Sequence, residues 1–359
     1  MALQQPGSIR ALNAMDTKTL EWNGPDLLDL AEVRRGDGDV LALDASGGIS
    51  CIDLRAMSVV ALGKIDLPTP EVGNSGAYGL VSRWRLHASA DGAFAAVVFD
   101  GGTTGFVVDL ENFAVTMALN GGDYHEDTVP FSACFLSLDG KAVLVHRTDW
   151  NRLDASDPRT GELLTPRGPT RYENDQCPAH YLDYFHGRLC ASPSGARLFD
   201  DGWVWSPVAI PMIFDAATWL TSNVWESEDG PSLRRLAQRD DWNVPACWID
   251  DERIVLGGME DWDDEEGQPI PAPPGVRIID LRDPADTPGR TLAMSAAPQA
   301  LFSDGHSLFA FDGRDTSTWS MRTDACLKVF EGFAASHHHA RRKELLELTA
   351  RRIRILALE

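Results

Sequence analysis

The sequence has 359 residues, 43% of them hydrophobic, and its 54 Asp and Glu outnumber 32 Lys and Arg to give a net charge of −22. A chain this acidic repels nucleic-acid phosphates and anionic lipid head groups, which excludes both as expected partners. Residues 1–8 lack the charged and apolar regions of a signal peptide, and no stretch approaches the roughly 18 apolar residues of a membrane span. We therefore expect a cytoplasmic protein.

Six turn dipeptides divide the chain into units of about 50 residues, the length of one four-stranded propeller blade. Each turn is followed by a short apolar run rich in Val, Ile, Phe and Ala, as in strands that are covered on both faces. Glycine suits these turns because a tight hairpin needs a residue at positive φ. The six dipeptides are Asp37-Gly38, Asp91-Gly92, Asp139-Gly140, Ser194-Gly195, Asp251-Glu252 and Asp304-Gly305.

Two further features recur in these units. Cys134, Cys190 and Cys247 each stand four or five residues before a turn, which places them on innermost strands as small buried side chains. The six cysteines form no Cys-x-x-Cys motif, and a chain of this length does not need disulfides, so we expect reduced thiols. In five of the units, a second apolar run further along the chain ends in an aspartate. These closing pairs are Ile52-Asp53, Val108-Asp109, Leu153-Asp154, Phe214-Asp215 and Ile279-Asp280.

The C-terminal residues 333–359 fit a seventh unit that lacks its outer strand. Residues 344–350 and 352–358 form two apolar runs, although their Arg, Lys, Glu and Leu also allow a helix at 340–350. Because the register of six other units outweighs local propensity, we predict strands. The N-terminal segment 8–22 can supply the missing strand, so that both chain ends share one blade and no sheet edge is left exposed.

We therefore predict one all-β domain over residues 1–359, a seven-bladed β-propeller of four-stranded antiparallel blades, with six blades as the alternative. The Asp-Gly turns and the strand-closing aspartates resemble those of the WD-repeat and YVTN-type seven-bladed β-propellers, which often have Trp-Asp at the strand end. This chain has no Trp-Asp there, so the resemblance is to a divergent form. It implies a rigid binding platform, usually without chemistry of its own.

The three insertions that interrupt the repeat are 155–186, 221–245 and 257–275. The first is punctuated by prolines and carries several aromatic residues. In the second, Pro231 and the i,i+3 pair Leu233 and Leu236 predict a short surface helix at 229–239. The third holds six carboxylates within residues 260–266, but it lacks the spacing of a calcium loop, and we interpret it as a solvated charged loop.

Tryptophan is concentrated between residues 203 and 262. Trp203, Trp205 and Trp248 fall on strand-like runs and are predicted to be core, whereas the tryptophans of the insertions are candidates for a surface patch. Function on rigid scaffolds usually resides in loops. We therefore predict a partner-binding face that is acidic and bears tryptophan, made of Trp225, Trp242, Trp262, Glu260, Asp261, Asp263 and Asp264.

We predict a non-catalytic protein–protein interaction module, a scaffold or a neutralising partner, which is a monomer on its own and binds a protein of basic character. Linear catalytic motifs such as Gly-x-Ser-x-Gly and His-Glu-x-x-His are absent, and we assign no catalytic residue, cofactor or metal. His337-His338-His339 offers at most two ligands on one side of a strand. The alternative is a propeller hydrolase or lyase with a metal or His/Asp site in its channel. A third, weaker hypothesis is a sugar-binding propeller.

Overall fold

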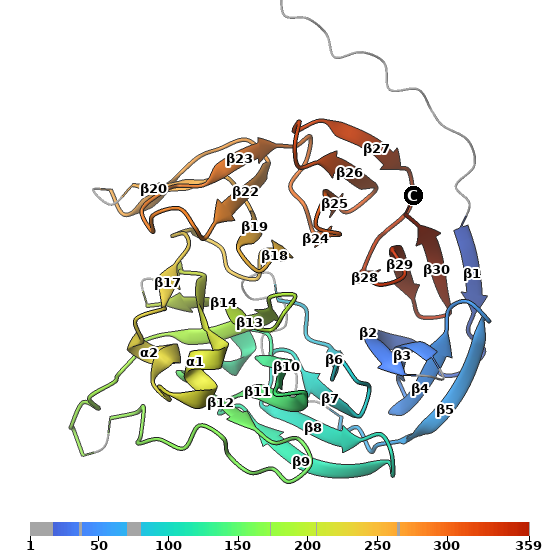
Figure 1. Ribbon diagram of the computed structural model, residues 1–359, viewed down its shortest axis with the longest axis horizontal. Helices are drawn as coiled ribbons and strands as arrows, with labels where there is room; N and C mark the ends of the chain where they lie inside the picture. The colour runs from blue at the N-terminus through green and yellow to red at the C-terminus, as the bar shows by residue number, and fades with distance from the viewer. Residues whose placement is uncertain are drawn as a thin grey trace, which may run out of the picture.

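The computed structural model describes residues 17–35, 38–69, 80–172, 174–205, 207–263 and 266–358. These residues form seven antiparallel blades around one axis, which makes the molecule a seven-bladed β-propeller (Figure 1). The blades are numbered in chain order, 1 to 7, by their innermost strands β2, β6, β10, β13, β18, β24 and β28.

Blade 1 contains β2 (Leu27–Arg35), β3 (Gly38–Asp44), β4 (Gly48–Asp53) and β5 (Ser58–Lys64), and blade 2 contains β6 (Trp84–Ala88), β7 (Phe94–Phe99), β8 (Thr104–Asp109) and β9 (Ala114–Asn120). Blade 3 contains β10 (Ala133–Leu138), β11 (Lys141–Asp149) and β12 (Arg152–Ser156). Blade 4 contains β13 (Phe185–Ala191), β14 (Arg197–Val204), β15 (Val208–Ala209), β16 (Met212–Asp215) and β17 (Arg234–Arg235).

Blade 5 contains β18 (Ala246–Asp250), β19 (Arg253–Gly257), β22 (Gly275–Asp280) and β23 (Arg290–Ala293), with a separate hairpin of β20 (Asp261–Asp263) and β21 (Gln268–Ile270). Blade 6 contains β24 (Ala300–Ser303), β25 (Ser307–Phe311), β26 (Thr316–Ser320) and β27 (Cys326–Phe330). Blade 7 contains β28 (His337–His339), β29 (Glu344–Thr349), β30 (Arg352–Ala357) and β1 (Thr17–Glu21).

The predicted turn dipeptides connect the first and second strands of blades 1 to 6. Gly92 (φ 68°) and Gly305 (φ 88°) take the positive φ that these turns require, while Asp37 lies outside the described residues. The turns between second and third strands therefore emerge on the opposite side of the ring, together with the connections from one blade to the next. We call this side the upper face.

The strand-closing aspartates cap the turn that follows the third strand. Asp53, Asp109 and Asp280 each accept a hydrogen bond, at 2.8–3.1 Å, from the backbone N–H two residues further along. Asp215 uses its carboxylate in the same way at 2.6 Å to cap helix α1 (Ala216–Thr221). The recurring aspartate is thus selected by turn geometry.

The predicted close of the third unit at Leu153-Asp154 is wrong. Strand β12 continues to Ser156, and Asp157 accepts the backbone N–H of Arg159 at 2.7 Å. Asp154 is instead buried inside the blade, where two arginines bind its carboxylate. Blade 3 has three strands in the part of the chain that the structure describes. In place of a fourth strand, Ser156 and Leu163 form an isolated bridge.

The hydrophobic core lies between neighbouring blades. Inner strands are apolar on both faces because each face packs on a different blade, and every residue of β7 is buried. Cys134, Cys190 and Cys247 lie on the innermost strands β10, β13 and β18, as predicted. Burial raises the pKa of the Cys134 thiol to about 12, so it stays protonated and behaves as a small hydrophobe.

The two ends of the chain close the ring in blade 7, as predicted (Figure 1). Strand β1 pairs antiparallel with β30, with Thr17 opposite Leu356, and the N–H of Trp22 donates to the carbonyl of Arg351 at 2.8 Å. Leu20 is buried in the cluster between blades 7 and 1. The strand prediction for 344–349 and 352–357 is confirmed against the alternative helix, and residues 8–16 lie outside the described part.

The helix predicted at 229–239 is wrong. Helices α1 and α2 (Glu226–Asp229) come earlier, and Arg234 and Arg235 form β17, which pairs with β16 as the outer strand of blade 4. Leu233 and Leu236 are partly buried against the clusters on either side, so strand pairing and apolar burial outweigh helical periodicity. None of the described helices is long and apolar enough to cross a bilayer.

Candidate functional site

A stack of buried aromatic rings underlies the upper face between blades 3 and 5. Phe185 at the start of β13 stacks on Trp203 with ring centroids 4.0 Å apart, and Trp203 stacks on Trp242 at 4.9 Å. All three are buried in one cluster, and Trp150, from the turn between β11 and β12, packs against it. The stack forms a rigid floor beneath the surface.

Two aromatic side chains are exposed above this floor. Tyr124, from the connection between blades 2 and 3, is 45% exposed, and Trp205, just beyond β14, is 46% exposed. The Tyr124 ring contacts Trp150 edge-on at 5.5 Å, and Trp205 meets the buried Trp203 edge-on at 5.3 Å. Trp203 and Trp248 are core as predicted, but the prediction for Trp205 is wrong because β14 ends at Val204.

Local backbone geometry holds Tyr124 in place. His125 adopts a left-handed conformation (φ 53°) as the N-cap of a short 3-10 helix, Glu126–Thr128. The indole Nε1 of Trp242 donates to the carbonyl oxygen of Thr128 at 2.8 Å, which ties the 240–243 loop to this connection. These two connections between blades are therefore fixed to each other by a buried hydrogen bond.

Exposed carboxylates lie on the loops that carry Tyr124 and Trp242. Asp123 precedes Tyr124 and is exposed, and Asp240 and Asp241 are exposed on the loop that Trp242 anchors. Glu126 and Asp127 are half-buried in the 3-10 helix. We define the acidic aromatic patch as Asp123, Tyr124, His125, Trp205, Asp240 and Asp241.

The three tryptophans of the predicted face lie in different environments. Trp242 is 4% exposed and belongs to the buried stack. Trp262, on β20, is half-buried and packs on the cluster of Tyr184, Val208, Ile210 and Met212. Trp225 is half-buried at the N-cap of α2, outside both clusters.

The acidic residues of the predicted face belong to the β20–β21 hairpin. Glu260 is half-buried, and Asp261 is exposed but forms an ion pair with Arg277 at 2.6 Å. The side chain of Asp263 and all of Asp264 lie outside the described part of the chain. Trp262 holds the hairpin on the apolar cluster of blade 4, and the ion pair with Arg277 neutralises Asp261.

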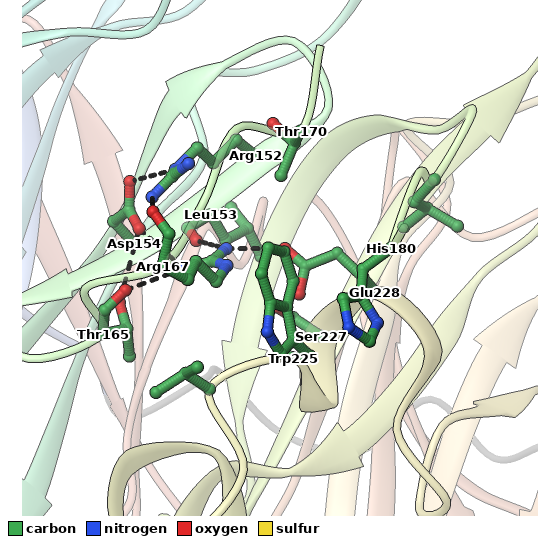
Figure 2. A network of polar contacts seen from close by, with 12 residues as sticks. Arg152, Leu153, Asp154, Thr165, Arg167, Thr170, His180, Trp225, Ser227 and Glu228 are labelled. Carbon is green, nitrogen blue, oxygen red and sulfur yellow. Dashed lines mark hydrogen bonds and ion pairs between the residues drawn. The ribbon is translucent and has the colours of Figure 1, made fainter. Parts of the chain in front are cut away.

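A buried ion-pair network anchors the insertion at 155–186 to helix α2 (Figure 2). Arg167 binds Asp154 at 2.7 Å and Glu228 at 2.6 Å, and the side chains of Arg167 and Glu228 are fully buried. The Arg167 guanidinium also lies over the ring of Trp225, 5.6 Å from its centroid, while His180 stacks on the same indole at 4.3 Å. Trp225 is thereby immobilised by its neighbours and belongs to a structural joint.

Two groups of side chains come closest to a catalytic arrangement. His186 Nδ1 and Asp200 Oδ2 are 2.6 Å apart, but both residues are buried in blade 4 beyond the reach of a substrate. His337 bridges Ser336 Oγ (2.8 Å) and Asp29 (3.0 Å), yet Ser336 Oγ also accepts a strand N–H. No three His, Cys, Asp or Glu side chains of the described residues gather closely enough to hold a metal ion.

Tyr124, His125 and Trp205 were not among the residues predicted from the sequence to bind a partner. A weak signal was present, because Gly121-Gly122-Asp123 marks a loop and places an aromatic pair next to carboxylates. The convergence of this loop with the 240–243 loop depends on blade packing and leaves no linear motif. Arg167 and Glu228, 61 residues apart, were missed for the same reason.

Comparison with known proteins gives similarity at the level of fold. No protein-family model and no curated protein sequence matches the chain. A chain in the crystal structure of the mitotic checkpoint complex is similar with a TM-score of 0.54 and 14% identity, over 100% of both chains. The β-propeller domain of Cps50 (Swd1) from Myceliophteria thermophila is similar with a TM-score of 0.55 and 14% identity, over 94% of this chain and 98% of that one. The chain thus has the fold of the WD-repeat-like seven-bladed β-propellers, as its turns and closing aspartates predicted.

Proposed function

We propose that this propeller is a non-catalytic protein-binding module whose upper face binds a basic protein through the acidic aromatic patch. The observation that carries the proposal is the exposure of Tyr124 and Trp205 over a rigid aromatic floor, with Asp123, Asp240 and Asp241 exposed on the loops that meet at this floor. Exposed large aromatics of this kind are unusual on a surface that has no partner.

The chemistry of the patch suits cationic side chains. Tyr and Trp bury a large area at a low entropic cost, and their ring faces attract the ammonium and guanidinium groups of Lys and Arg. The carboxylates add long-range attraction that speeds the encounter with a positively charged partner. We also propose that Glu260 and Asp261 of the β20–β21 hairpin add to this attraction.

The similar structures support this assignment. One neighbour is a chain of a mitotic checkpoint complex, so a propeller of this shape occurs there in a protein assembly. We further propose that this chain acts as a cytoplasmic monomer until it meets its partner, in the role of a scaffold or of a neutralising partner.

The test is affinity purification from source cells with quantitative mass spectrometry, comparing variants that keep the fold. The double variant Tyr124→Ala/Trp205→Ala should lose a basic protein that the wild type captures stoichiometrically. Tyr172→Ala is the matched control, because Tyr172 is an exposed aromatic outside the patch. Charge reversal by Asp240→Lys/Asp241→Lys should also abolish capture, with Asp286→Lys as the exposed control elsewhere.

Capture that survives both patch variants would refute the patch as the binding face. An acidic captured protein, or capture that strengthens as salt rises, would refute the basic partner, because screening weakens attraction between opposite charges. Turnover of a substrate by the purified chain would refute the non-catalytic assignment.

A further inference from the structure

Arginines gather at the propeller axis, although the chain carries a net charge of −22. Arg188 lies midway along β13 and is exposed, while its neighbours Gly187 and Leu189 are buried. Since β13 is an innermost strand, a side chain exposed at its middle reaches solvent at the axis (Figure 1). Arg85 lies on the innermost strand β6, and Arg83 directly precedes that strand.

The side chain of Arg188 makes no hydrogen bond or ion pair with any residue that the structure describes. Asp201 stands opposite Arg188 on β14, but Asp201 forms an ion pair with Arg239. Although Arg188 reaches solvent, the protein atoms crowded around the axis desolvate its guanidinium and lower its pKa, and the positive charge of Arg85 lowers the pKa further. Two like charges near each other in a partly desolvated place are costly unless an anion joins them.

The other carboxylates at this level of the axis are already occupied. Asp100 binds Arg85 at 3.3 Å, and Asp29 binds His337 at 3.0 Å. Each of these carboxylates also accepts a backbone N–H, at 3.0 Å and 2.8 Å respectively. Burial, and then the Arg85 charge, lower the pKa of His87 to about 3, so this imidazole is neutral. Arg188 is therefore left with positive charge and donor groups that no described residue uses.

We propose that Arg188 and Arg85, with Arg83 beside them, bind a small divalent oxyanion of the phosphate class at the propeller axis. A guanidinium presents planar pairs of N–H donors that match two oxygens of such an anion. Arg83, Arg85 and Arg188 carry three positive charges against the single charge of Asp100, and a divalent anion neutralises the two charges that remain. This axial site is separate from the acidic aromatic patch and does not depend on the protein-binding proposal.

The test is isothermal titration calorimetry with inorganic phosphate and, separately, with acetate, at low ionic strength. Arg188→Gln should weaken phosphate binding by about tenfold or more, the usual effect of removing a charged hydrogen-bond donor. Arg314→Gln is the matched control, because it removes the same charge from a side chain that is 89% exposed. Arg188→Lys should bind with intermediate affinity, since it keeps the charge but not the planar pair of donors.

Thermal unfolding in an anion-free buffer separates binding from a structural role. Without anion, Arg188→Gln should be at least as stable as the wild type, because the desolvation of the Arg188 charge and its repulsion by Arg85 outweigh its attraction to Asp201. A lower melting temperature for this variant would overturn the proposal. So would the absence of phosphate binding to the wild type, equal affinities for Arg188→Gln and Arg314→Gln, or acetate binding as tightly as phosphate.

Discussion

Arg167 provides the sharpest test of how the blade 3 insertion is held. Replacing it by methionine keeps much of the side-chain volume but leaves the Glu228 carboxylate buried without a cation, while Asp154 keeps its ion pair with Arg152. Breaking a fully buried ion pair by removing one partner costs about 3–5 kcal/mol. We therefore expect Arg167→Met to lower the free energy of unfolding by about that amount.

The assay is urea unfolding at neutral pH, followed by tryptophan fluorescence and far-ultraviolet circular dichroism. Trp219 and Trp225 lie 6.0 and 5.6 Å from the Arg167 guanidinium, so fluorescence also reports local opening. Arg171→Met is the control, since the ion pair of Arg171 with Asp149 is half exposed and should contribute less than about 1 kcal/mol.

A second variant distinguishes an orphaned charge from lost packing. Adding Glu228→Gln to Arg167→Met should recover part of the loss, because it removes one buried negative charge. A loss below about 1 kcal/mol for Arg167→Met, or a loss equal to that of Arg171→Met, would refute the reasoning.

Three further substitutions test other parts of the ring. Burial raises the pKa of Asp29, but the hydrogen bond and the charge of His337 lower it from 3.8 to about 2. The stability that the ionised Asp29 contributes is therefore present above about pH 4 and is lost as the pH falls towards 2. Asp29→Asn should therefore cost about 2 kcal/mol at pH 7, and its urea-unfolding difference from the wild type should shrink below pH 4; a pH-independent difference would contradict this. Leu20→Ala should cost about 2–4 kcal/mol in the same assay because Leu20 seals the blade closed by β1, and a cost below 1 kcal/mol would mean that closure contributes little. Gly187→Ala would place a Cβ 1.9 Å from the carbonyl oxygen of Asp201 and should lower the melting temperature, whereas Gly168→Ala, with its nearest atom 3.9 Å away, should not; equal melting temperatures would contradict the close packing.

The repeat could be predicted from the sequence because it depends on local chemistry. Gly92 and Gly305 are needed where a hairpin takes positive φ, and Asp53, Asp109 and Asp280 are needed where a side chain caps a turn. Such requirements recur in most of the blades and act within a few residues. They therefore leave a readable pattern even at 14% identity to the similar structures.

The candidate site could not be predicted in the same way, because exposure depends on where strands end and how blades pack. Trp205 lies one residue beyond the end of β14, and that single step turns an expected core residue into an exposed one. Trp242 belongs to a loop but is drawn inwards by stacking on Trp203 and by its hydrogen bond to Thr128. Neither outcome follows from hydrophobicity or from position in the repeat.

Because β1 pairs with β30 inside one blade, the ring does not depend on where in that blade the chain is interrupted. Thr17 stands directly across the ladder from Leu356, so a short designed turn could join the two strands into an ordinary hairpin. The polypeptide could then be opened at another exposed connection, such as the one that follows Asp286. A circularly permuted chain of this kind should assemble the same ring, with every strand keeping its neighbours.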